Sequence, residues 1–120
     1  MKRDQRLTRG SDFLRVRRQG HSWAHPLLVV SADRNELGVT RFGFIVSRRI
    51  GKAVVRNRVK RQLREAVRCH LGEVPAGWDV VILAKAPITE ARFADIESAV
   101  AQSLGRARAW MVERAAAVKQ

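Results

Sequence analysis

Apolar residues recur along this chain with two different periods, which predicts both strands and helices. Two short apolar stretches, residues 26–32 and 40–47, flank a polar turn at residues 33–38, and this arrangement is typical of an antiparallel hairpin. A third stretch, residues 78–84, is apolar at almost every position, which predicts a strand buried on both faces. The pattern thus predicts three strands.

Helical spacing marks three other segments. Ser11 can cap a short helix that ends before Gly20, and Gly51 marks the break before a long helix over residues 53–71. Thr89 can cap a last helix. The apolar stripe of that helix follows a three-and-four spacing and consists of Phe93, Ile96, Val100, Leu104, Ala107 and Met111. The predicted order is helix, strand, strand, helix, strand, helix.

Elements in this order pack best as one mixed sheet with helices against it, an α+β fold of the α/β-sandwich type. A chain of 120 residues is long enough for one compact domain and too short for two, so we expect a single domain over residues 1–120. Residues 1–9 are polar and residues 115–120 carry no clear pattern, so both ends are expected to be flexible.

The composition argues against a membrane-spanning or a secreted protein. The longest apolar runs, residues 26–30 and 80–84, are far shorter than the ~20 residues of a membrane-spanning helix. The N-terminus lacks the apolar stretch of a secretory signal. The single cysteine, Cys69, cannot form an intramolecular disulfide, which fits a reducing, cytoplasmic setting.

Positive charge is concentrated in two segments. The chain carries a net charge of +13, of which residues 1–20 contribute +5 and residues 48–68 contribute +8, so the remainder is neutral. A focused excess of this size indicates a polyanionic partner, either a nucleic acid or an anionic membrane surface.

The second basic segment coincides with the predicted long helix, and its residues separate into two arcs at ~100° per residue. The arc expected to pack on the sheet consists of Val55, Val59, Leu63, Ala66 and Val67. The neighbouring arc carries Arg56, Asn57, Lys60, Arg61, Arg64 and Arg68, with Arg58 on the opposite flank. Like charges at this spacing repel one another and crowd a helix start that is already positive. We therefore expect a bound anion, and phosphate fits both arginine forks and free backbone amides.

Two points in this helix stay open. First, the basic face of the helix can simply be exposed to solvent, without binding a partner. The amide of Asn57 can read a base edge or a 2′-hydroxyl, can hold the neighbouring arginines in place, or can form a hydrogen bond at the helix start.

Residues 50–65, Ile-Gly-Lys-Ala-Val-Val-Arg-Asn-Arg-Val-Lys-Arg-Gln-Leu-Arg-Glu, closely resemble the arginine–asparagine–arginine signature of the bacterial ribonuclease P protein family. Residues 43–49 are similar to the family's strand before this helix, and residues 78–85 are similar to its last strand. The Leu-Thr, Asp-Phe and Gly pattern within residues 7–20 resembles its opening helix. The resemblance covers residues 5–110.

The resemblance implies an α/β sandwich with a left-handed β-α-β crossover, against the right-handed rule. It also implies the protein subunit of ribonuclease P, a ribonucleoprotein endonuclease that removes the 5′ leader from precursor tRNA. The RNA subunit would be catalytic and would position the magnesium ions, so the protein would bind no cofactor or metal itself. Its partners would be the catalytic RNA and precursor tRNA, and neither DNA nor a membrane. The protein would raise substrate affinity and lower the magnesium requirement.

Site residues carry over by matching position. Those expected to bind the catalytic RNA are Arg56, Asn57, Arg58, Lys60, Arg61, Arg64 and Arg68. Those expected to bind the single-stranded leader, in a cleft between the first helix and the sheet, are Phe13, Arg17, Leu28, Val30, Ser31, Ser47, Arg48 and Arg49. Many relatives carry aromatic residues where this chain has Arg17, Leu28 and Ser31. Because stacking of a base on an aromatic ring contributes ~1–3 kcal/mol, we expect a more electrostatic and less base-selective leader contact here.

Other functions remain to be weighed. A non-enzymatic ribosome-associated or regulatory RNA-binding protein would show the same concentration of charge. A membrane-surface helix fits less well because the apolar arc lacks Trp or Phe anchors, and a helix-turn-helix DNA reader would need a second helix where a strand is predicted. His21, His25 and His70 lack the spacing of metal ligands, so we expect packing or surface roles for them and no catalytic group on the protein.

Overall fold

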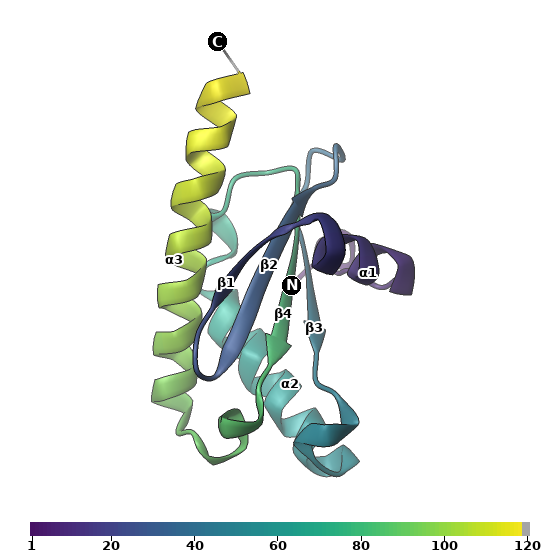
Figure 1. Cartoon of the computed structure of the whole chain (residues 1–120), viewed down its shortest axis with the longest axis vertical. Coiled ribbons are helices and arrows are strands. Elements are labelled where there is room, and N and C mark those ends of the chain that lie inside the picture. The colour runs from purple at the N-terminus through teal and green to yellow at the C-terminus, as the bar shows by residue number, and fades with distance from the viewer. Residues whose placement is uncertain (119–120) are drawn as a thin grey trace.

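The structure, a computed structural model, describes residues 1–118 of the chain. Its helices are α1 (Gly10–Gln19), α2 (Ala53–Arg68) and α3 (Phe93–Val118). Its strands are β1 (His21–Ala24), β2 (Leu28–Arg34), β3 (Arg41–Ile45) and β4 (Trp78–Ala84) (Figure 1). Short 3-10 helices lie at Arg3–Gln5, Arg48–Ile50, Leu71–Glu73 and Ala86–Glu90. None of the helices in this part of the chain is long and apolar enough to cross a membrane.

The four strands form one mixed sheet in the order β1-β2-β4-β3. Strands β1 and β4 both pair antiparallel with β2, while β3 pairs parallel with β4. The predicted hairpin between residues 26–32 and 40–47 is therefore wrong, because β4 lies between β2 and β3. An interior position suits the most apolar strand, and the predicted burial of β4 on both faces is confirmed, with only Leu83 partly exposed.

Strand β1 adds one strand to the predicted order. Only Trp23 of its four residues is buried, and the other three are exposed. A short edge strand of this kind has no run of alternating apolar and polar residues that the sequence pattern could reveal.

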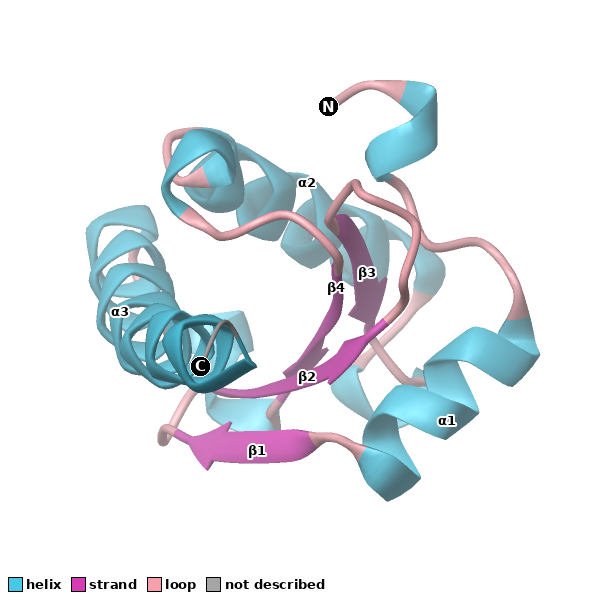
Figure 2. Ribbon diagram, turned by 90° about the horizontal axis from the view of Figure 1, so that it is seen from above, coloured by secondary structure: helices cyan, strands magenta, loops and turns pink. Residues whose placement is uncertain are grey.

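Strands β3 and β4 form a β-α-β unit because α2 connects them. In Figure 1 both strands run downward with β4 to the left of β3, and Figure 2 shows α2 on the face that lies behind the sheet in Figure 1. A connection that crosses this face in this direction is left-handed. The expectation from the family resemblance is met, and the unit departs from the right-handed rule.

Helices cover both faces of the sheet. Helices α2 and α3 pack on one face and α1 lies on the other (Figure 2). Alternate residues of a strand point to opposite faces. Leu28 and Val30 accordingly belong to the main core under α2 and α3, whereas Val81 packs with Leu7 and Val16 beneath α1. The predicted α+β sandwich is confirmed.

The N-terminal segment is anchored before α1 begins. Arg6 bridges to Phe42 of β3, Leu7 is buried, and the Leu7 N–H donates to the Phe42 carbonyl oxygen at 2.8 Å. The stretch expected to be flexible over residues 1–9 therefore contains a fixed part. At the other end α3 continues to Val118, and the expectation for residues 119–120 lies outside the described residues.

Neither predicted helix cap is present. Helix α1 begins at Gly10, so Ser11 lies within its first turn, and Arg9 at the cap position makes no side-chain cap. Thr89 lies in the 3-10 helix before α3, where its hydroxyl donates to the Ala86 carbonyl oxygen at 3.1 Å. The apolar stripe of α3 is confirmed, since all its members are buried except the partly exposed Phe93.

Candidate nucleic-acid interface

The two arcs predicted for the long helix are both present on α2. Its buried residues are Val59, Leu63, Ala66 and Val67, and Val55 packs partly buried against the same core. These positions hold the helix on the sheet and on α3, so the neighbouring arc must face outward. The direction of the basic arc is thereby fixed by packing.

Most cations of α2 are exposed. Asn57, Arg61 and Arg64 project into solvent and form neither a salt bridge nor a side-chain hydrogen bond with another described residue. Arg68 forms only a loose ion pair with the exposed Glu65, at 3.5 Å. Exposed ion pairs of this kind contribute little to stability, so these guanidinium groups are available to an outside anion.

Two arginines of α2 are used differently. The Arg56 guanidinium donates to the Gly51 carbonyl oxygen at 2.9 Å, which ties the helix start to the preceding loop. The Arg58 guanidinium donates to the Thr89 carbonyl oxygen at 3.1 Å, so Arg58 lies on the flank next to the 3-10 helix that precedes α3. The structure thus separates Arg58 from the row formed by the other predicted RNA-binding residues.

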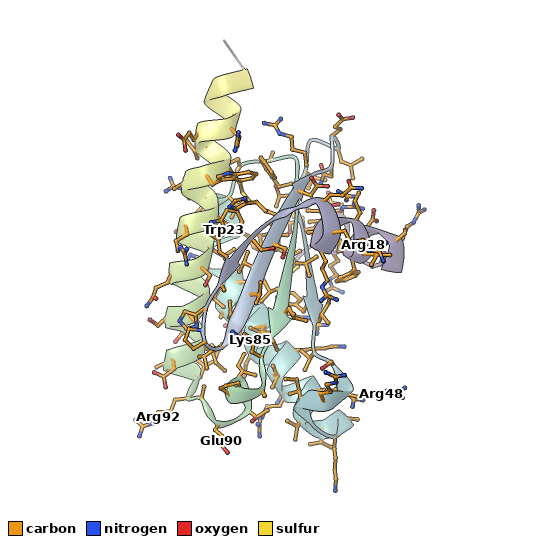
Figure 3. All side chains as sticks on the ribbon, viewed as in Figure 1. Arg18, Trp23, Arg48, Lys85, Glu90 and Arg92 are labelled. Carbon is orange, nitrogen blue, oxygen red and sulfur yellow. The ribbon has the colours of Figure 1, made fainter. Side chains whose placement is uncertain are left out.

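A second basic group precedes α2. Ser47, Arg48 and Arg49 are all exposed between β3 and the helix, and Figure 3 shows Arg48 projecting outward from this segment. Lys52 occupies the cap position of α2 without capping it through its side chain, and the first turn contains no acidic residue. Uncapped amides and nearby arginines together make this end of α2 strongly positive.

A buried ion cluster holds α1 against the sheet. The carboxylate of Asp79 is fully buried in β4 and is bonded to Arg15 of α1, to Arg41 of β3 and to Asn35. Burial alone would raise the pKa of Asp79, but the hydrogen bonds from Arg41 and Asn35 and the charge of Arg41 keep that pKa below its usual value. This cluster was not predicted, although an aspartate inside an apolar strand is a signal of a buried ion pair.

Helix α1 also fixes Phe13 at one wall of the predicted leader cleft. Phe13 lies against the backbone of β3 at Gly43, where any side chain would overlap its ring. Arg17, one helical turn further on, is exposed. Ser31 is almost fully buried, and its hydroxyl lies 2.8 Å from the hydroxyl of Ser22 in β1.

The assignment of Leu28 and Val30 to this cleft is wrong. Both are fully buried on the face that α2 and α3 cover, opposite α1. They differ from Ser31 by an odd number of positions, and the two-residue period of a strand cannot bring them to the same face as Ser31. The two-residue period of the strand is therefore the signal in the sequence that separates these positions from Ser31.

Other residues of the sheet lie on the face that α1 covers. Val29 pairs with Leu83 across β2 and β4, and Ile45 of β3 pairs with Leu83 from the other side. All three are only half-buried, and they alternate with the core residues, so they form a row on the α1 face. Ser47 follows this row along the chain.

The histidines have partners inside the protein. The ring of His21 stacks on Trp110 with centroids 4.9 Å apart. His25 Nδ1 accepts a hydrogen bond from a backbone N–H at 3.0 Å, and His70 Nδ1 lies 2.8 Å from a carboxylate oxygen of Glu73. Within residues 1–118, no group of three or more His, Cys, Asp or Glu side chains is placed to hold a metal ion.

Sequence comparisons relate this chain to one protein family. The sequence model of the family described as Ribonuclease P matches residues 1–108. The ribonuclease P protein component of Herpetosiphon aurantiacus is 42% identical over 110 residues, which cover 92% of this chain and 89% of the relative. The corresponding protein of Roseiflexus castenholzii is 42% identical over 108 residues, covering 89% of this chain and 88% of the relative.

Solved structures give the same result. The RNase P protein of Staphylococcus aureus superposes with a TM-score of 0.81 at 31% identity, covering 87% of this chain and 95% of that one. The RNase P protein from Thermotoga maritima superposes with a TM-score of 0.76 at 31% identity, covering 84% and 96%.

Proposed function

This chain belongs to the bacterial ribonuclease P protein family, the protein component of an endoribonuclease whose catalytic subunit is RNA, and we propose that the outward arc of α2 binds that RNA. The observation that carries the proposal is the row of exposed side chains at Asn57, Arg61 and Arg64 without partners among the described residues. A row of guanidinium groups carried by a helix fits successive phosphates of an RNA backbone. The proposed contact set on this arc is Arg56, Asn57, Lys60, Arg61, Arg64 and Arg68, and Arg58 would contact the RNA from the opposite flank of the helix.

The second part of the proposal concerns the substrate. We place the single-stranded 5′ leader of precursor tRNA between α1 and the row formed by Val29, Leu83 and Ile45. Phe13 would stack on a base, and Arg17 would bind a phosphate or stack its guanidinium. The exposed Ser47, Arg48 and Arg49 would contact the leader where it leaves this row.

These two surfaces assign the protein a supporting role in the reaction. By holding both the catalytic RNA and the leader, the chain would raise substrate affinity and reduce the magnesium concentration that the holoenzyme needs. The magnesium ions are expected at the RNA, and no step of the proposal passes through a protein side chain. A cytoplasmic location, where precursor tRNA is made, is part of the same proposal.

Cleavage of a precursor tRNA by the partner RNA subunit, with and without this protein, tests the proposed function. At a magnesium concentration too low for the RNA alone, addition of the protein should restore cleavage at the mature 5′ end. The same RNA without protein at high magnesium is the control for RNA folding. Protein that leaves low-magnesium cleavage unchanged, while the control RNA is active, would contradict the proposal.

A further inference from the structure

A cavity lies at the free edge of β3, and Phe13 separates it from the predicted leader cleft. The N-terminal segment pairs with β3 only at Phe42, and beyond this pairing a space of about 250 Å³ opens. Its walls include Thr8 of the N-terminal segment, Phe13 of α1 and Phe44 of β3. The volume is below the roughly 300–1,000 Å³ of a pocket for a drug-sized ligand, so the cavity suits a single ring system.

The cavity exposes unused backbone groups. In a parallel ladder, alternate residues direct both their N–H and C=O groups to the same edge. The Phe42 carbonyl oxygen accepts the Leu7 N–H, so Phe42 directs its backbone groups away from β4, and Phe44 two residues later does the same. No strand or segment of residues 1–118 pairs with β3 opposite Phe44. One donor and one acceptor therefore face the cavity.

Cations surround this edge. Arg6, Lys60 and Arg64 line the cavity, and none of them forms an ion pair with a described residue. No acidic side chain is among the lining residues. These groups match the three parts of a nucleotide. The apolar rings suit the faces of a base, the backbone donor and acceptor suit its edge, and the three cations suit its phosphate.

The face of the sheet on which the cavity lies indicates whether the catalytic RNA or the leader of precursor tRNA occupies it. Leu7 and Phe13 border the cavity from the α1 side. Phe44, which supplies the unused backbone groups, has the same orientation as Phe42 and packs toward the α2 face, whereas Ile45 points to the α1 face where the leader is proposed to lie. Two of the three cations, Lys60 and Arg64, belong to α2 itself. The occupant is thus continuous with the RNA bound along α2.

We propose that the cavity at the β3 edge takes one unstacked nucleotide of the catalytic RNA, and this inference rests on the proposed role of α2. The base contacts Phe44, and its edge meets the backbone N–H and C=O of Phe44. The phosphate lies among Arg6, Lys60 and Arg64. The protein would then recognise one specific extruded base in addition to the RNA backbone.

Two variants test the site through the affinity of the protein for its catalytic RNA. Phe44→Leu keeps an apolar side chain but removes the ring, and it should weaken binding about tenfold. Arg6→Gln removes one cation, and it should reduce the slope of log affinity against log salt by about one unit. The matched controls are Phe93→Leu, a half-buried ring on α3, and Arg3→Gln, an exposed arginine outside the cavity. Both controls should bind like the unmodified protein.

Ultraviolet crosslinking of the unmodified complex gives an independent measurement. The proposal predicts a crosslinked nucleotide of the catalytic RNA on the peptide that contains Phe44, which does not depend on the folding of any variant. Arg61→Ala distinguishes the cavity proposal from the proposed role of α2. If Arg61→Ala weakens RNA binding while Phe44→Leu and Arg6→Gln do not, the cavity proposal fails and the role of α2 stands. If none of the three changes weakens binding, the proposed function fails as well. A loss confined to precursor tRNA that carries a leader would identify the leader as occupant and overturn the assignment to the catalytic RNA.

Discussion

Arg41 and Asp79 lie directly opposite each other on the parallel strands β3 and β4 and are joined by two hydrogen bonds. Arg41 Nε donates to Asp79 Oδ1 at 2.8 Å, and Arg41 Nη2 donates to Asp79 Oδ2 at 2.7 Å. The same carboxylate binds Arg15 of α1. One buried aspartate thereby fixes the helix that forms a wall of the proposed leader cleft to the two strands beneath it.

Replacement of this aspartate should destabilise the protein. Asp79→Asn leaves Arg15 and Arg41 without their shared carboxylate, and breaking a buried pair by removing one partner costs roughly 3–5 kcal/mol. We expect about 3 kcal/mol, because both arginines are partly exposed and keep some hydration. Urea unfolding followed by circular dichroism measures the change. Glu97→Gln, at an exposed position of α3, is the control and should change stability by less than about 0.5 kcal/mol.

The same cluster should make stability depend on pH. The pKa of Asp79 in the folded protein is held below its usual value of 3.8, so the ionised form is favoured by folding. Its contribution is fully present above the usual value and is lost as the pH falls through the lower folded value. Urea unfolding from pH 6 to pH 2 should therefore show a steeper loss of stability below about pH 4 in the unmodified protein than in Asp79→Asn. Parallel pH profiles in the two proteins would exclude Asp79 as the source.

The leader contact should depend on charge more than on base identity. Arg17→Gln should weaken holoenzyme binding of a precursor tRNA with a leader and should reduce the salt slope by about 0.7 unit, the value for one phosphate of a single strand. A precursor without a leader should bind equally well to both proteins. Arg18→Gln is the control, since Arg18 is the next residue of α1 and is likewise exposed (Figure 3). A shallow salt slope together with a strong preference for particular leader bases would speak against this account.

The far end of α3 is held by aromatic contacts. The ring of Trp110 lies 4.9 Å from His21, 5.5 Å from Trp23 and 5.4 Å from Trp78, measured between centroids. Trp110→Ala should destabilise the protein by about 2 kcal/mol, less than the 3–5 kcal/mol of a fully buried tryptophan because Trp110 is only half-buried.

Hydrogen exchange locates this effect. Amides of β1 and of the last turns of α3 should exchange faster in Trp110→Ala, while those of β4 should change only with global stability. Val112→Ala, at an exposed position of the same helix, should leave the pattern unchanged. Uniform acceleration over the whole sheet would show that Trp110 does not act locally.

The sequence predicts those features that depend on neighbouring residues. Helix α2 and its two arcs follow from a 3.6-residue period within sixteen positions, so Val59 and Leu63 could be assigned to the core and Arg61 to the surface. Strand β4 was predictable from its continuous apolar run. Each of these signals is local, and each is confirmed.

Features that depend on distant residues could not be read in this way. The insertion of β4 between β2 and β3 is decided by pairing between segments more than thirty residues apart, and a polar turn at residues 33–38 suggested a simpler pairing. The four residues of β1 are too short for a pattern. The error at Leu28 and Val30 has a different origin, because a match of positions to a family does not show which face of a strand each side chain occupies.

The affinity of the protein for its catalytic RNA, measured as a function of salt, tests the central claim that the outward arc of α2 binds this RNA. Arg61→Ala and Arg64→Ala should each weaken binding and reduce the salt slope by about one unit, because each removes one phosphate contact. Arg92→Ala, an exposed arginine between β4 and α3 that is visible in Figure 3, should retain the full slope. An unchanged slope in both α2 variants would contradict the account.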